Sequence, residues 1–163
     1  MKGREILGLP VWYPGGGREA GRIVDLLFDP HTGKVEALIL EGELEGAVPF
    51  KSLAWRDPAG FEIQESPPSG DPPSGLKSWR EVKGCSLWGQ GHSLEDFIVD
   101  PSTGDITSLE VSEGIIDDLI HGRQQVPLRE ISLEELLNFR KGVRENDEAL
   151  SPLWQQSHRQ DRQ

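Results

Sequence analysis

Short apolar and β-branched runs alternate with explicit turn signals along most of the chain. Residues 22–28 and 35–40 flank one five-residue turn, and residues 93–99 and 106–111 flank a second turn of the same design. Strand, turn and strand at this spacing predict two β-hairpins. In each turn Asp accepts a backbone N–H, Pro presets φ and Gly takes a left-handed position. The predicted structural turn residues are Asp29, Pro30, Gly33, Asp100, Pro101 and Gly104.

The two hairpins belong to a longer internal repeat. Residues 23–40 recur as residues 94–111, an offset of 71 (94 minus 23), and six of the 18 positions are identical. With small gaps, residues 8–12 match 84–88 and residues 48–50 match 126–128. A repeat of this size predicts two copies of one β unit, which we place at residues 1–64 and 76–131. Units of roughly 60 residues lie near the lower limit for folding alone, so we expect the copies to pack on each other or on a partner.

Other segments differ from the two copies. Residues 65–75 hold four prolines and two glycines, which predicts a linker. Ser132 and Glu135 form a capping box ahead of Leu133, Leu136 and Leu137, so a helix is expected over residues 132–142. Residues 143–163 are polar and are expected to form a mobile tail. Pro49 and Pro127 predict edge positions or β-bulges for the strands that carry them.

Composition narrows the classes of function. The chain has 17 Lys and Arg against 28 Asp and Glu, a formal net charge of −11. Phosphate backbones and anionic lipid surfaces attract basic proteins, so direct nucleic-acid binding and membrane adsorption are disfavoured. No apolar run approaches the length of a membrane span, the start lacks a secretory pattern, and Cys85 is the single cysteine. We therefore expect a cytoplasmic protein without membrane insertion.

Candidate chemistry is sparse. The four histidines show no spacing typical of metal ligands, so no metal is expected. Asp25 recurs as Asp96 and Asp29 as Asp100; a turn residue is needed in both copies, whereas an active site is not. Cys85 has no evident base nearby and is interpreted as a small buried core residue. The glycines at 15–17 lack the context of a phosphate loop and predict a hairpin tip. No catalytic residue or cofactor is predicted.

One inserted segment suggests an interaction surface. The second copy carries about seven additional residues before its last strand, and their apolar members recur at helical spacing. This segment is either a lid over one end of the unit or a surface for a partner. Trp12 and Trp88 are repeated and predict core positions, whereas Trp55, Trp79 and Trp154 are not repeated and suggest contacts between the repeats or with a partner. The candidate interaction surface comprises Ile115, Ile116, Leu119, Ile120 and Trp154.

The ordered set of motifs resembles the PRC-barrel family. The resemblance rests on an opening Gly-x-x-apolar-Trp strand, a strand with a central Asp, a D-x-x-T-G turn and a closing Val-Pro strand. These motifs appear twice, although the second copy has His92 where the first has Gly21. Copy one contributes Gly8, Val11, Trp12, Gly21, Ile23, Asp25, Asp29, Thr32, Gly33, Val48 and Pro49; copy two contributes Gly84, Leu87, Trp88, Leu94, Asp96, Asp100, Thr103, Gly104, Val126 and Pro127.

The resemblance implies a mainly β chain of two tandem small PRC-type β-barrels, joined by the Pro/Gly-rich linker and followed by a short C-terminal helix and a polar tail. Similar barrels serve as docking modules in the photosynthetic reaction-centre H subunit and the ribosome maturation factor. The expected function is therefore a non-enzymatic protein–protein interaction or scaffold module, whose partner is another protein or a second copy. The alternatives are a ribosome-assembly factor related to the ribosome maturation factor and an enzyme of unknown type.

Overall fold

The structure is a computed structural model, and it describes residues 1–65, 71–87, 92–114, 118, 121–128 and 133. The chain is mainly β, as expected, with short helices between strands. The elements are α1 Gly3–Ile6, β1 Pro10–Trp12, β2 Glu19–Asp29, β3 Lys34–Glu41, β4 Gly46–Pro49, the 3-10 helix η1 Phe50–Ser52, β5 Leu53–Arg56, β6 Gly60–Ile63, β7 Lys77–Ser78, α2 Trp79–Val82, β8 Ser86–Leu87, β9 His92–Val99, β10 Ile106–Ser112 and β11 Gln124–Pro127.

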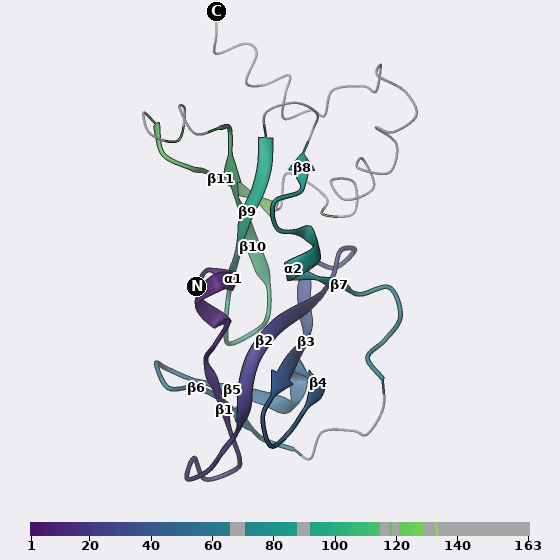
Figure 1. Cartoon of the computed structure of the whole chain (residues 1–163), viewed down its shortest axis with the longest axis vertical. Helices are drawn as coiled ribbons and strands as arrows, with labels where there is room; N and C mark the ends of the chain where they lie inside the picture. The colour runs from purple at the N-terminus through teal and green to yellow at the C-terminus, as the bar shows by residue number, and fades with distance from the viewer. Residues whose placement is uncertain (66–70, 88–91, 115–117, 119–120, 129–132, 134–163) are drawn as a thin grey trace, which may run out of the picture.

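The strands form two curled sheets (Figure 1). The first sheet has the order β4-β3-β2-β1-β6-β5, with β7 paired to β2, and its one parallel pair joins β1 to β6. The second sheet has the order β11-β10-β9-β8 and is antiparallel throughout its described strands. β4 and β11 lie at sheet edges among the described strands, which confirms the prediction made from Pro49 and Pro127.

The two sheets share one register. In the first, β2 pairs with β3 so that Leu26 faces Leu38; in the second, β9 pairs with β10 so that Phe97 faces Leu109. The ladder shifts at equivalent places in both sheets, because each strand pair carries one extra residue at each of two β-bulges. The unpaired residues are Val24 and Glu36 in the first sheet and Glu95 and Thr107 in the second. The internal repeat is therefore a repeat of backbone geometry as well as of sequence.

The predicted turns have the expected geometry. The N–H of His31 donates to Asp29 Oδ1 at 2.8 Å, and the N–H of Ser102 donates to Asp100 Oδ1 at 2.9 Å. Gly33 and Gly104 have φ of 67° and 80°, a region that glycine occupies without a Cβ clash. The predicted role of the Asp-Pro-x-Thr-Gly turns is confirmed.

The two turns also pair with each other. The N–H of Val35 donates to the carbonyl of Gly104, and the N–H of Ile106 donates to the carbonyl of Gly33, both at 2.8 Å. Between them Lys34 and Asp105 form an antiparallel bridge, with Nζ 3.4 Å from Oδ1. Adding 71 to Val35 gives Ile106, and subtracting 71 from Gly104 gives Gly33, so each of the two hydrogen bonds is the counterpart of the other. The two halves are therefore related by a local two-fold axis that passes between Lys34 and Asp105.

The opening segment of each half crosses to the other half. Lys2 bridges Ile98 of β9, and Ser78 of β7 pairs with Leu27 of β2, the equivalent position. As a result α1 packs on β9 and α2 packs on β2. This exchange places a short helix of each half on a strand of the other.

One hydrophobic core joins the halves, as expected for units too small to fold alone. Phe28 and Phe97 meet edge to face with ring centroids 4.9 Å apart, and both belong to one contiguous cluster of buried residues. Trp79 is 4% exposed in this cluster, and its helix α2 packs on β2 of the first half, so it lies at the contact between the repeats, one of the two roles suggested for it. Cys85 is 7% exposed, which confirms that it is a small core residue.

The prediction that Trp12 is a core residue is wrong in part. Trp12 is half-buried, and its indole Nε1 donates to the carbonyl of Ala59 at 2.8 Å, so the polar end of the ring faces the surface. The repeat predicted the position of Trp12 in its strand but not how far its side chain is buried. The hydrogen-bond partner Ala59 lies in the turn between β5 and β6, and among the described strands these two border only the first copy.

Several predictions fall outside the described residues. They concern Trp88, most of the inserted segment, the helix at 132–142 apart from Leu133, and the tail at 143–163. Leu133 is helical and buried in the core. Of the predicted linker, residues 71–75 are exposed and belong to no strand or helix.

Candidate interaction surfaces

The surface predicted from sequence lies outside the described residues at Ile115, Ile116, Leu119, Ile120 and Trp154. The described ends of the inserted segment are anchored on the second sheet. Ser112 Oγ donates to Asp118 Oδ2 at 2.7 Å and accepts from the N–H of Gly114 at 3.2 Å. Arg123 closes the segment from its other end, with Nε 3.8 Å from Asp118 Oδ2. Both ends of the insertion are therefore held against β9 and β10.

The repeated carboxylates Asp25 and Asp96 position the exchanged helices. Asp96 is buried and accepts from the N–H of Arg4, at the start of α1, at 3.3 Å and from Trp79 Nε1 at 3.2 Å. Asp25 accepts from Ser78 Oγ and from the N–H of Arg80, at the start of α2, the latter at 3.3 Å. A carboxylate at a helix N-terminus satisfies N–H groups that have no partner within the helix.

Sequence reasoning assigned these two residues to structure but missed which element each one holds. The available signal was the match of residues 8–12 to residues 84–88, an offset of 76 (84 minus 8). Residues 2–6 and 78–82 stand in the same relation to their copies, so one role had to fit both segments. Nothing local indicated that each helix would lie on the other copy.

A network of ion pairs surrounds Glu110 on the outer face of the second sheet. The Glu110 side chain is 4% exposed, and its carboxylate lies 2.6 Å from Lys2 Nζ and 3.1 Å from Arg123 Nη1. Arg4 Nη1 is 3.8 Å away, and Arg123 Nη2 also lies 3.7 Å from Glu95 Oε2. The network therefore ties α1 and the inserted segment to β9 and β10.

The same contacts set the protonation of this cluster. Burial alone would raise the pKa of Glu110, but hydrogen bonds from Lys2 and Arg123 outweigh it, and the pKa lies below its ordinary value of 4.5. The hydrogen bond to Glu110 raises the pKa of Arg123 above its ordinary value. Both groups are charged near neutral pH, so Glu110 acts as an ionic anchor. A general base would need a pKa nearer the working pH.

Sequence reasoning missed Glu110, although a signal existed. Its equivalent in the first copy is Ile39, and a carboxylate at an apolar position of a duplicated strand is an asymmetry between the copies. Ile39 pairs with Asp25 as Glu110 pairs with Asp96, so the two side chains occupy the same place on the two sheets.

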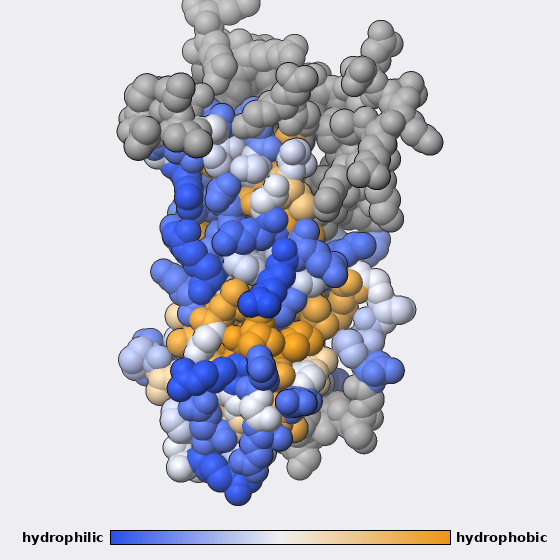
Figure 2. Space-filling view, in the orientation of Figure 1, coloured by the Kyte–Doolittle hydropathy of each residue, from blue (hydrophilic) through white to orange (hydrophobic). Residues whose placement is uncertain are grey.

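The outer faces of the two sheets differ in chemistry at matched positions. On the first sheet, outward positions carry Val24, Ile39 and Ala47, all half-buried and outside the hydrophobic core cluster. The matched residues of the second sheet are Glu95, Glu110 and Gln125. Inward neighbours such as Leu38 and Leu109 are identical. Figure 2 shows a band of hydrophobic side chains across the part of the molecule where β2 and β3 lie in Figure 1.

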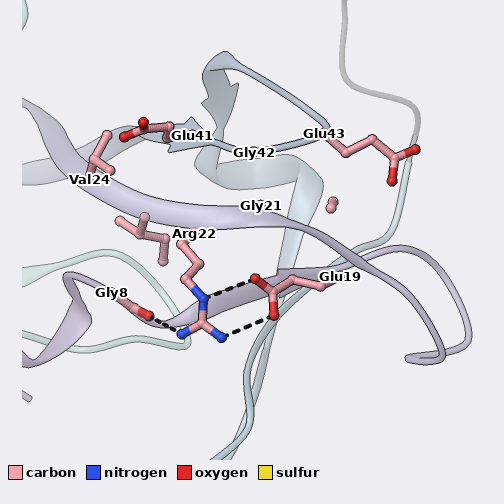
Figure 3. A pocket seen from close by; sticks show the side chains of 10 residues that line it. Gly8, Glu19, Gly21, Arg22, Val24, Glu41, Gly42 and Glu43 are labelled. Atoms are coloured by element: carbon pink, nitrogen blue, oxygen red, sulfur yellow. Dashed lines mark hydrogen bonds and ion pairs between the residues drawn. The ribbon is translucent and has the colours of Figure 1, made fainter.

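A surface hollow of about 460 Å³ adjoins this apolar face. It is lined by β2 around Gly21 and by the β3–β4 turn, and it includes Val24 and Glu41 (Figure 3). A side chain in place of Gly21 would meet the backbone carbonyl oxygen of Glu41 at 3.0 Å, so glycine keeps the turn close to β2. Arg22 crosses the hollow. Its Nε lies 3.0 Å from Glu19 Oε1, and its Nη1 donates to the carbonyl oxygen of Gly8 at 3.1 Å.

Two kinds of site are absent from the described part of the chain. Among residues 1–65, 71–87, 92–114, 118, 121–128 and 133, no three metal-ligating side chains converge. Within the same residues, no helix has the length and apolar character needed to cross a bilayer.

Comparisons with known proteins place the chain in no family. No protein-family model matches the sequence. No curated protein matches it either.

Proposed function

We propose that this chain is a tandem PRC-barrel protein of the cytoplasm that acts as a non-enzymatic docking module or scaffold for another protein. Two copies of one β unit supply a rigid frame, and partner binding is assigned to outward surfaces. The resemblance of both copies to the PRC-barrel pattern supports the proposal, because barrels of that family serve as docking modules.

One observation carries the proposal. The two copies have the same register and bulges, yet their outer faces differ, with Ile39 in one and Glu110 in the other. Packing constrains inward residues in both copies, whereas outward residues are free to diverge. When outward residues differ between two sheets of the same register, the two surfaces typically make different contacts. The carboxylates of Asp25, Asp96 and Glu110 are engaged in helix anchoring or ion pairs, which argues against acid–base chemistry at these positions.

The proposal is tested by cross-linking in the native host followed by affinity purification and mass spectrometry of the full chain. A specific protein partner, cross-linked to an outward surface at near-stoichiometric yield, is the expected result. Recovery of the chain alone under conditions that preserve known complexes would argue against a scaffold. Turnover of a small molecule by the purified chain would favour an enzyme.

The inserted segment gives a mutational test of the same function. If residues 115–120 form the partner surface, Leu119→Asp should abolish capture of the cross-linked partner and leave the circular dichroism spectrum unchanged, because a charge opposes apolar docking. Loss of folding in Leu119→Asp would instead support the role of a lid over the second unit. Thr107→Asp, which introduces the same side chain at an exposed position of β10 outside the segment, provides the matched control for capture.

A further inference from the structure

We infer that the outer face of β2, β3 and β4 in the first half binds an amphipathic segment of another protein that carries an apolar stripe flanked by Lys or Arg. This inference rests on the proposed docking function and names the surface and the chemistry of the partner. The surface consists of Val24, Ile39 and Ala47, together with the acidic turn Glu41–Gly42–Glu43–Leu44–Glu45.

The internal repeat provides the reference for this face. In the second half, the chain covers the equivalent positions itself, because Arg123 of the inserted segment and Lys2 bond the carboxylate of Glu110. The first half has a short β3–β4 turn in place of that insertion and an apolar Ile39 in place of Glu110. In the first half β7 and the start of α2 lie on β2 beside Asp25, but no described insertion takes the place of Arg123, and Val24, Ile39 and Ala47 stay partly exposed. A partner would take the place of the missing insertion.

Charge selects the kind of partner. Glu41 lies two residues beyond Ile39 on β3, and Glu45 directly precedes β4; both are exposed and make no ion pair within the described part of the chain. Arg22 pairs with Glu19 at 3.0 Å, and Arg18 pairs with Glu43 at 2.9 Å, so these nearby cations are already neutralised. The apolar face therefore ends in uncompensated negative charge, which favours Lys or Arg at the matching end of the partner.

The same charges disfavour a second copy of this chain. Each copy has a formal net charge of −11. A two-fold contact would set the acidic turns of both copies beside one apolar patch, and like charges at an interface oppose association. A basic amphipathic segment brings complementary charge together with apolar side chains.

A pair of synthetic peptides tests the chemistry on the full chain. The first is a fluorescein-labelled helix with Leu on one face and Lys elsewhere; the second has Glu in place of every Lys. Fluorescence anisotropy should show binding of the Leu/Lys peptide to the wild-type chain and none of the Leu/Glu peptide. Equal binding of both peptides, or no binding of the Leu/Lys peptide, overturns the inference.

Substitutions then separate docking from simple charge attraction. Ile39→Glu introduces the residue of the second half and should weaken binding of the Leu/Lys peptide about ten-fold or more, since it removes an apolar anchor. If charge alone attracted the peptide, its binding would instead strengthen in Ile39→Glu, because the chain becomes more acidic. Ala47→Gln adds no charge and should also weaken binding of the Leu/Lys peptide. It provides the test if Ile39→Glu disturbs folding. Thr107→Glu is the matched control: it adds the same charge on the second sheet, where the first has Glu36, and should leave peptide affinity unchanged.

Two further measurements identify the occupant. Sedimentation that shows a wild-type dimer lost in Ile39→Glu would assign the face to a second copy and overturn the inference. If the native partner is captured equally by wild type and Ile39→Glu, the face is wrong while the docking function stands. If the wild-type chain captures no partner at all, the docking function itself fails. Capture by wild type and loss in Ile39→Glu, with Thr107→Glu unaffected, supports both.

Discussion

The Glu110 carboxylate shows how one residue can differ in role from its repeated counterpart. It is almost fully buried, yet Lys2 and Arg123 keep about 30% and 41% of their side chains exposed. The cations therefore retain part of their hydration while they neutralise the buried charge. Removal of the carboxylate takes this ion pair from Lys2, while Arg123 keeps Glu95 and Asp118, and water can reach both cations. These contacts moderate the cost relative to a fully buried pair.

Glu110→Gln should destabilise the protein by about 1 to 3 kcal/mol, because it removes two charge-assisted hydrogen bonds from a buried acceptor. Urea unfolding at neutral pH measures the change. Glu36→Gln, an exposed carboxylate on the first sheet, serves as control and should stay within about 0.5 kcal/mol of wild type. Equal effects of the two substitutions would show that the network around Glu110 adds nothing to stability.

Acid should erase the difference between wild type and Glu110→Gln. The pKa of Glu110 in the folded protein lies below 4.5, its ordinary value, so the folded state binds its proton less readily than the unfolded state. The stabilisation is complete above that ordinary value and is lost as pH falls through the lower pKa of the folded protein. The difference in unfolding free energy between the two proteins should therefore narrow as pH falls below 4.5. A constant gap over that range would contradict the assigned cause.

At the level of helices and strands, the two halves are linked by the exchange of their opening segments. α1 and α2 are one turn each and too short to be stable alone. Asp96 and Asp25 fix their first turns from the opposite half, and β-bridges at Lys2 and Ser78 align the chain that precedes them. The helices are therefore products of the contact between the halves.

Asp96→Ala and Asp25→Ala should differ in cost. Asp96 is buried and accepts from Trp79 Nε1 and two backbone N–H groups, so its loss leaves buried donors unsatisfied and should cost about 2 to 4 kcal/mol. Asp25 is half-buried, so water can replace part of its contacts, and about 1 kcal/mol is expected. Paired denaturant titrations measure both. A larger loss for Asp25→Ala would show that burial does not govern these caps.

For the whole chain, the halves form a single structural unit. Their cores merge through Phe28 and Phe97, their turns pair through Gly33 and Gly104, and their first helices are exchanged. The turn contacts and the exchanged helices have symmetry-related partners, so the interface resembles that of a two-fold dimer joined into one chain. Such an interface gains stability from covalent linkage mainly through the effective concentration of the two halves.

Cleavage between the halves should leave them associated. A protease site in place of residues 66–70 allows the folded chain to be cut, and the fragments should elute together on a sizing column, because the merged core and the exchanged helices remain. After the cut, the thermal midpoint should depend on protein concentration, as for a dimer. Folded halves that elute separately would show that the core contacts do not hold the units together.

Several features followed from the amino-acid pattern alone. The strand-turn-strand units, the Asp29 and Asp100 turns, the edge positions of Pro49 and Pro127 and the buried Cys85 all depend on local φ preferences, alternation and hydrophobicity. The repeat also predicted that the halves would contact each other or a partner, since each is too small to bury a core alone. These properties are set within one strand or one turn of the chain, where nearby residues decide the outcome.

Tertiary contact decided the rest. Which half each short helix packs on, the anchoring roles of Asp25 and Asp96, the ion network of Glu110 and the apolar face at Ile39 depend on residues 13 to 108 positions apart in sequence. A carboxylate or an isoleucine has the same local propensity whether it points to a neighbouring helix, a cation or water. Only the approach of distant segments determines its partners, because ion pairing and burial depend on separation in space.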